Sequence, residues 1–220
     1  MCKKLKDKIF IFIIKIRNHF FGEIILEPRS KITHEKSLIK KKEPDASSDF
    51  QHLLPLSSDA FIKKLDNWSI QYKYFEHVPL RTVNESKSVQ DMFLSTKQGA
   101  GHIKNLFLRD HKKNNILIVA HQDALIDLKK LQFKIDTGRL SFGSSDRLME
   151  HLGVFPGAVT PFSMINGVHK NVVLFIDLSL KNFKKIYLHP LVNDRTLEIT
   201  IENLEMFFKK INVIPKWINL

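Results

Sequence analysis

From Leu56 onward, short apolar and polar stretches alternate along the chain and predict a series of brief helices and strands. Phe61, Ile62 and Leu65 follow Ser57 at helical spacing, so we expect a helix there with the serine side chain near its start. Residues 72–77 alternate with the period of two that is typical of a strand. The other expected helices cover 82–93, 127–133, 144–151 and 202–211, and the other expected strands cover 102–109, 115–120, 171–176 and 185–188. Because these elements follow one another without a strict βαβ repeat, the pattern predicts a mixed α/β domain of the α+β-like kind.

The first quarter of the chain has a different pattern. An apolar run at 9–14 is interrupted by Lys15 and Arg17, and it is much shorter than the ~20 residues that cross a bilayer. With the apolar residues at 20–26 it could form an amphipathic helix at a membrane surface, or it could be an upstream extension without a role of its own. Residues 27–51 are polar and read as a linker. We therefore expect 1–54 to be a basic, poorly ordered extension without stable membrane insertion, and 55–220 to form the domain.

Composition narrows the class of protein. The 220 residues are 43% hydrophobic and 26% charged, which excludes a wholly disordered chain. A single cysteine, Cys2, excludes a disulfide framework and a cysteine zinc cluster. The net charge of +12 favours nucleic acid as a partner over an acidic membrane surface, although a cationic surface without a specific partner stays open. The domain carries +7 of this charge, and the sequence contains no P-loop, no GxGxxG and no HExxH motif.

Lys104 and Asn105 form the first candidate site. They follow a Gly-rich turn at 99–101 and stand near the start of an expected strand. Successive strand side chains point to opposite faces, so Lys104 and Leu106 face one way while Asn105 and Phe107 face the other. The lysine either extends to solvent or points into a pocket, and the pattern alone leaves both open.

Two further segments carry candidate chemistry. Pro156-Gly157 predicts a tight turn with positive φ at Gly157, and Gly153 and Gly157 leave backbone amides open to a ligand. His189 precedes Pro190, which holds it extended, so its ring could serve as a base or as a hydrogen-bond donor. A plain loop and a structural histidine are the alternatives.

The order of these segments resembles a known family. The segments are KNLFL from Lys104, LSFGSSDRLMEHLGVFPGAVTPF from Leu140, and HPLVN from His189. Together, and with Glu76, His77 and Pro79 upstream, they resemble the bacterial free-standing prolyl-tRNA editing proteins, the ProX (PrdX) branch of the YbaK/ProRS-associated superfamily. The resemblance runs from Leu56 to Trp217.

The resemblance implies a single compact domain with a curved, mixed, largely antiparallel sheet flanked by helices. It implies a cytoplasmic hydrolase that acts in trans on the ester of mischarged aminoacyl-tRNA, most simply alanine on the proline tRNA, and that needs no metal or organic cofactor. The acceptor end of proline tRNA is the expected partner, and prolyl-tRNA synthetase is a candidate second partner. By resemblance the catalytic positions are Lys104, Asn105 and His189, and the substrate-binding positions are Gly153, Val154, Phe155, Pro156, Gly157 and Phe162.

The chemistry of an activated ester agrees with these residues. Hydrolysis places negative charge on the carbonyl oxygen, so a cation such as Lys104 or the amides around Gly157 could stabilise it. The domain shows no Ser-His-Asp or Cys-His set, which favours attack by water, helped by the terminal ribose hydroxyl of the tRNA. A small pocket would admit alanine and exclude proline; Phe162, Met164 and Ile165 are either its walls or part of the core.

Three positions depart from the family pattern: Ile103 before the lysine, Gly143 in the SFGS segment, and Gly167 after Asn166. They leave open which amino acid is removed, with cysteine and serine as alternatives to alanine. A non-catalytic tRNA-binding or synthetase-associated module also stays open, as does a membrane-tethered form that uses residues 1–26.

Overall fold

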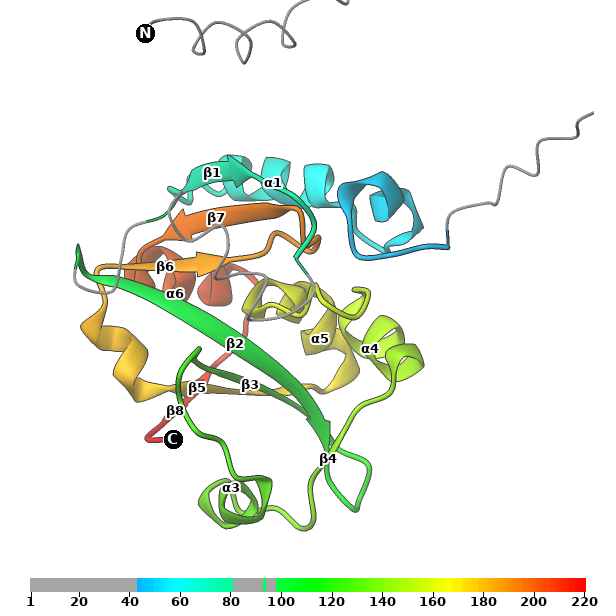
Figure 1. Ribbon diagram of the computed structural model, residues 1–220, viewed down its shortest axis with the longest axis vertical. Helices are drawn as coiled ribbons and strands as arrows, with labels where there is room; N and C mark the ends of the chain where they lie inside the picture. Colours follow the sequence, from blue (N-terminus) through cyan, green and yellow to red (C-terminus); the bar gives the residue numbers. More distant parts are fainter. Residues whose placement is uncertain (1–42, 81–92, 94–97) are drawn as a thin grey trace, which may run out of the picture. The chain divides into compact units, whose positions relative to one another are not determined.

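The strand that follows the Gly-rich turn, β2 (Ala100–Arg109), is the longest strand of the described fold (Figure 1). The computed structural model describes residues 43–80, 93 and 98–220, all of which belong to the second of two units of the chain, Lys42–Leu220. The first unit, Met1–Lys41, lies outside the described residues, as do the predictions made for it. The helix expected over 82–93 lies outside them too, except for Phe93.

Eight strands are described: β1 (Lys73–Glu76), β2, β3 (Asn115–His121), β4 (Ser141–Phe142), β5 (Val173–Asp177), β6 (Lys185–Leu188), β7 (Arg195–Ile199) and β8 (Lys216–Ile218). The described α-helices are α1 (Ser58–Asn67), α3 (Leu128–Lys134), α4 (Ser145–Leu152), α5 (Met164–Gly167) and α6 (Ile201–Lys210). Short 3₁₀ helices cover η1 (Ser48–Leu53), η4 (Pro161–Ser163), η5 (Val168–Lys170) and η6 (Leu178–Asn182).

The strands form one mixed sheet in the order β1-β7-β6-β2-β3-β5-β8, and β4 pairs with β2 off this path. Among the described strands, β1–β7, β6–β7, β2–β3 and β2–β4 pair antiparallel, while β2–β6, β3–β5 and β5–β8 pair parallel. The expected α/β fold with a mixed sheet between helices is therefore confirmed, and the antiparallel pairs hold a narrow majority.

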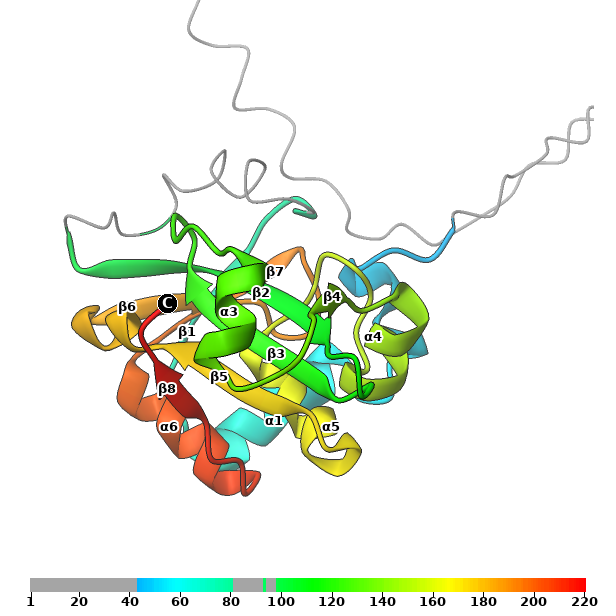
Figure 2. The same cartoon turned by 90° about the horizontal axis from the view of Figure 1, so that it is seen from below.

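Each face of the sheet has its own core. Helices α1, α4, α5 and α6 pack on one face, where Phe61, Phe162 and Phe207 form mutual ring contacts at 5.0–5.8 Å (Figure 2). Helix α3 packs on the other face, with Leu131 against Leu108. The apolar side chains of β2 alternate between these cores: Ile103 and Phe107 belong to the first, and Leu106 and Leu108 belong to the second.

Side-chain caps begin the helices where the sequence predicts them. Ser57 accepts a hydrogen bond from the backbone N–H of Ala60, Asp127 from that of Lys129, and Ser144 from that of Arg147. These caps satisfy N–H groups that the first turn of a helix leaves without partners. The sequence reading missed the short strands β4 and β8 and the strand β7.

The folded unit begins earlier than the sequence predicts. Residues 43–54 were assigned to the extension, yet Ala46 and Leu54 are buried in the larger core. The backbone N–H of Asn193 also donates to the Ala46 carbonyl at 2.8 Å. The sequence does not predict that this segment is folded, because it is mostly polar and its few apolar side chains follow neither helical nor strand spacing. Among the described residues, no helix has the length and apolar content that crossing a membrane requires.

Candidate active site

A gap in the sheet beside β2 creates the site. On one edge of β2, β6 pairs with Ala100–His102 and β4 pairs with Leu108–Arg109. Between them, no described strand pairs with this edge, and a cavity of about 320 Å³ lies alongside it. Its lining residues are Leu80, Phe93, His102, Ile103, Lys104, Asn105, Leu106, Gln122, Gly157, Val159, Tyr187, Leu188, His189 and Thr196.

Lys104 supplies the positive charge of this cavity. Its side chain is half-buried, and its ammonium donates to the carbonyl of Ala124 in the turn after β3. That turn is itself closed by a hydrogen bond from the Ala124 N–H to the His121 carbonyl at 3.0 Å. Among the described lining residues no carboxylate accompanies the lysine, so its charge is not neutralised within the cavity.

Asn105 connects β2 to the loop after α4. Its Nδ2 donates to the carbonyl of Val159 at 2.8 Å, which holds the loop against the unpaired edge of the strand. Its Oδ1 is buried and has no hydrogen-bond partner within the described part of the chain. An unsatisfied buried acceptor is costly, so the Nδ2–Val159 hydrogen bond is the described polar contact that holds this side chain.

The loop after α4 contributes its second half to the cavity. Gly153 ends α4 with φ of +65°, and Gly157 has φ of +95°, as the Pro-Gly turn predicts. Only Gly157 and Val159 of this loop line the cavity. Val154 is buried in the core, while Pro156 is exposed. Val154 therefore supports the loop from the core, Pro156 lies on its solvent side, and neither lines the cavity.

His189 lines the cavity from the end of β6. Its Nδ1 lies 2.9 Å from the carbonyl of Arg195. A carbonyl can only accept, so Nδ1 carries the proton and Nε2 remains an acceptor. Burial is the main cause that lowers the pKa of His189 below its ordinary 6.5, and the nearby His77 acts in the same direction. The ring is thus held neutral with a defined tautomer.

Phe162 does not reach the cavity, which corrects the prediction for this residue. Its side chain is 0% exposed, and its ring packs 5.0 Å from that of Phe61 and 5.1 Å from that of Phe207. Met164 is likewise buried in this core. Phe162 and Met164 could have been walls of the pocket or part of the core, and the structure places both in the core.

The sequence reading missed the aromatic wall of the cavity. His102 and Tyr187 stack with ring centroids 5.0 Å apart, and Phe93 packs on Tyr187 at 4.8 Å. Thr196 was missed because β7 was not predicted. Its hydroxyl lies 2.8 Å from Nε2 of His77, whose Nδ1 donates to the Val78 carbonyl at 2.8 Å.

Metal coordination finds no support in the geometry. In the part of the chain that is described, no three His, Cys, Asp or Glu side chains gather as ligands would. The polar side chains that line the cavity instead carry one ammonium, two imidazoles, two amides and two hydroxyls. This set suits a substrate that carries a polar carbonyl and an amino group.

Comparison with known families decides the relationship. The model of the aminoacyl-tRNA editing domain matches residues 81–207. The chain belongs to the aminoacyl-tRNA editing domain family. Lys104, Asn105, Gly157 and His189 all lie within the matched range of this editing domain, whereas the segment before residue 81 lies outside it.

Several relatives of this editing domain have names that refer to prolyl-tRNA or its synthetase. The prolyl-tRNA editing protein ProX of Acetoanaerobium sticklandii is 37% identical over 154 residues, which cover 70% of this chain and 91% of the relative. The prolyl-tRNA synthetase associated domain-containing protein 1 of Xenopus laevis is 30% identical over 156 residues, covering 69% and 88%. A solved structure described as a candidate trans-editing enzyme for prolyl tRNA synthetase has the same fold, with a TM-score of 0.55, 17% identity, and coverage of 74% and 97%.

Proposed function

We propose that this protein is a trans-editing deacylase that hydrolyses the ester bond of mischarged aminoacyl-tRNA, with alanine on the proline tRNA as its substrate. The observation that carries the proposal is one cavity that brings together an unneutralised lysine, a positive-φ glycine turn and a neutral histidine from three distant segments. Family membership and the similarity to ProX support the same reaction.

Lys104 is the proposed electrophilic group. Ester hydrolysis proceeds through a tetrahedral species with negative charge on the former carbonyl oxygen, and a preorganised cation stabilises that charge. One N–H of its ammonium is used by the Ala124 carbonyl, which fixes the direction of the side chain. Two N–H groups remain for the carbonyl oxygen or for an oxygen of the terminal nucleotide.

His189 is the proposed acceptor of a proton. Because Nδ1 donates to the Arg195 carbonyl, Nε2 can accept from the attacking water or from the ribose hydroxyl that assists it. A pKa below 6.5 keeps this nitrogen unprotonated at neutral pH. An aminoacyl ester is already activated, so a weak base and a charged donor are sufficient chemistry.

Size is the proposed basis of selection. The cavity of about 320 Å³ is near the lower end of the range of small-molecule sites, roughly 300–1,000 Å³, and it must also hold part of the terminal ribose. The Asn105–Val159 hydrogen bond fixes one wall and so limits expansion.

The proposed partner is the acceptor end of the proline tRNA, and a synthetase association would follow the naming of the relatives. We propose the cytoplasm as the site of action. The net charge of residues 43–220 is +4, because residues 43–54 add three acidic side chains to the +7 of residues 55–220, and this positive charge agrees with contact to a phosphate backbone.

The decisive test is a deacylation panel in which one proline tRNA carries alanine, cysteine, serine or proline. We expect alanine to be released fastest and proline to be retained. Fastest release of cysteine or serine would keep the reaction and change the substrate, and binding of the tRNA without release of any amino acid would contradict the proposal.

A further inference from the structure

The loop that carries His189 has an unfavourable backbone conformation. It connects β6 to β7, and Leu191 within it has φ of +69°. Positive φ is uncommon for a residue with a bulky side chain and persists only when the surroundings fix it. Leu191 is 1% exposed, so packing contributes to fixing it. The remaining constraint comes from polar contacts at the following residues.

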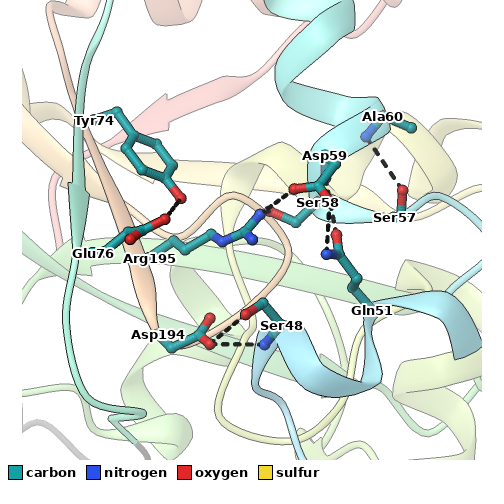
Figure 3. A network of polar contacts seen from close by, with 10 residues as sticks. All are labelled: Ser48, Gln51, Ser57, Ser58, Asp59, Ala60, Tyr74, Glu76, Asp194 and Arg195. Carbon is teal, nitrogen blue, oxygen red and sulfur yellow. Dashed lines mark hydrogen bonds and ion pairs between the residues drawn. The ribbon is translucent and has the colours of Figure 1, made fainter. Parts of the chain in front are cut away.

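The segment before α1 holds Asn193 and Asp194 of this loop. The Asn193 N–H donates to the carbonyl of Ala46 at 2.8 Å. Oδ2 of Asp194 accepts from the backbone N–H of Ser48 at 2.9 Å and from its hydroxyl at 2.7 Å (Figure 3). Three hydrogen bonds therefore join residues 46–48 to the loop across more than 140 positions of sequence.

A second set of contacts holds the end of the loop. The Arg195 guanidinium donates to Oδ1 of Asp59 at 2.5 Å and to the hydroxyl of Ser58 at 3.3 Å. Gln51, in η1, donates to Oδ2 of the same Asp59 at 2.8 Å (Figure 3). The carbonyl of Arg195 is the acceptor that orients the ring of His189, so these contacts act on the group that sets its tautomer.

We propose that the segment Ala46–Leu53 is a positioning element of the active site, which holds the His189–Arg195 loop so that Nε2 of His189 faces the substrate. Ser48 and Asp194 are its positioning residues. The segment precedes the range that the family model matches, whereas Asp194 lies within it, so the contact joins a residue outside the matched range to one inside it. The proposal rests on the function proposed above for the kinetic part of its test.

The perturbation is Asp194→Ala in the full chain, which removes the acceptor of both Ser48 bonds. Asp194→Asn is the conservative variant, because it removes the charge and retains an acceptor oxygen. Thr200→Ala is the matched control, since it removes the cap of α6 and costs stability, and Thr200 makes no described contact with residues 46–53 or with the loop. Ser48→Ala is a milder variant that tests the contact if Asp194→Ala does not fold.

Two readouts separate positioning from stability. Steady-state deacylation should show kcat lowered by about tenfold in Asp194→Ala with KM nearly unchanged, since roughly 1 Å of misplacement can cost up to about a hundredfold. Asp194→Asn should recover most of this loss, and Thr200→Ala should keep the kcat of the unmodified chain. The ¹⁵N signals of the His189 ring should report the Nδ1–H form in the unmodified chain and a mixture of tautomers in Asp194→Ala.

The two proposals fail in different ways. A change of His189 tautomer in Asp194→Ala, in a protein that deacylates none of the esters, would support the positioning element and overturn the proposed function. An unchanged kcat and unchanged ring signals in Asp194→Ala, with activity intact, would overturn the positioning element. A loss of kcat of equal size in Thr200→Ala would also overturn it, because general destabilisation would then explain the effect.

Discussion

Replacement of Lys104 by methionine tests the central electrostatic claim. Methionine retains most of the side-chain volume and removes the charge and the donor. A hydrogen bond to a charged group contributes about 1.5–3 kcal/mol, and loss of one donor to an oxyanion lowers kcat by about 10²–10³-fold. Among the described lining residues Lys104 is the one permanently charged group, so no described neighbour can substitute for it. We expect kcat to fall at least about a hundredfold, which corresponds to roughly 2.7 kcal/mol.

The assay is single-turnover release of radiolabelled alanine from mischarged proline tRNA at saturating protein. Lys63→Met, on the exposed face of α1, is the matched control and should leave the rate unchanged. Thermal melting checks that loss of the Lys104–Ala124 contact does not unfold the protein. A rate for Lys104→Met within a few-fold of the unmodified chain would refute the role assigned to the lysine.

Three further outcomes follow from the geometry. The kcat/KM should fall in acid with an apparent pKa below 6.5, because burial lowers the pKa of His189 and protonation removes its acceptor; the acid limb should vanish in His189→Gln. Phe162→Ala should lower the free energy of unfolding by about 3–5 kcal/mol in denaturant titrations, while kcat at low temperature changes little. If the variant keeps its stability but begins to hydrolyse the proline ester, the assignment of Phe162 to the core is contradicted. Deletion of residues 2–42 should leave the melting temperature nearly unchanged. Deletion of residues 2–54 should lower the melting temperature markedly, because Leu54 and the positioning element are lost. Equal melting temperatures for the two deletions would contradict the assignment of residues 43–54 to the folded unit.

The sequence predicts correctly where helices α1, α3 and α4 begin, because their capping residues act on neighbouring residues. The serine and aspartate caps at Ser57, Asp127 and Ser144 hydrogen-bond within three residues, so the sequence carries their full signal. Strand β7 was missed although Arg195–Ile199 alternates, because it follows a buried loop with no turn signal of the usual Gly or Pro-Gly kind. The short strands β4 and β8 exist only through their partners, which no local pattern reveals.

For the site as well, the sequence predicts some features and misses those that depend on tertiary packing. The resemblance identified Lys104, Asn105, Gly157 and His189, and the fold brings all four to one cavity. It could not separate residues that face the cavity from those that support it, such as Phe162. Whether a residue faces the cavity or the core depends on tertiary packing, which a sequence motif does not encode.

The gap beside β2 explains why these residues act together. A strand with both edges fully paired would use all of its backbone groups and leave no room beside it. Here β6 and β4 pair with the two ends of the same edge, and the middle is faced by a loop and a histidine ring instead of a strand. The loop is tied by Asn105 and the ring by the Arg195 carbonyl, so both walls are fixed before a substrate arrives. Such preorganisation is what an electrostatic mechanism requires, because groups that need not reorient lose less energy in the transition state.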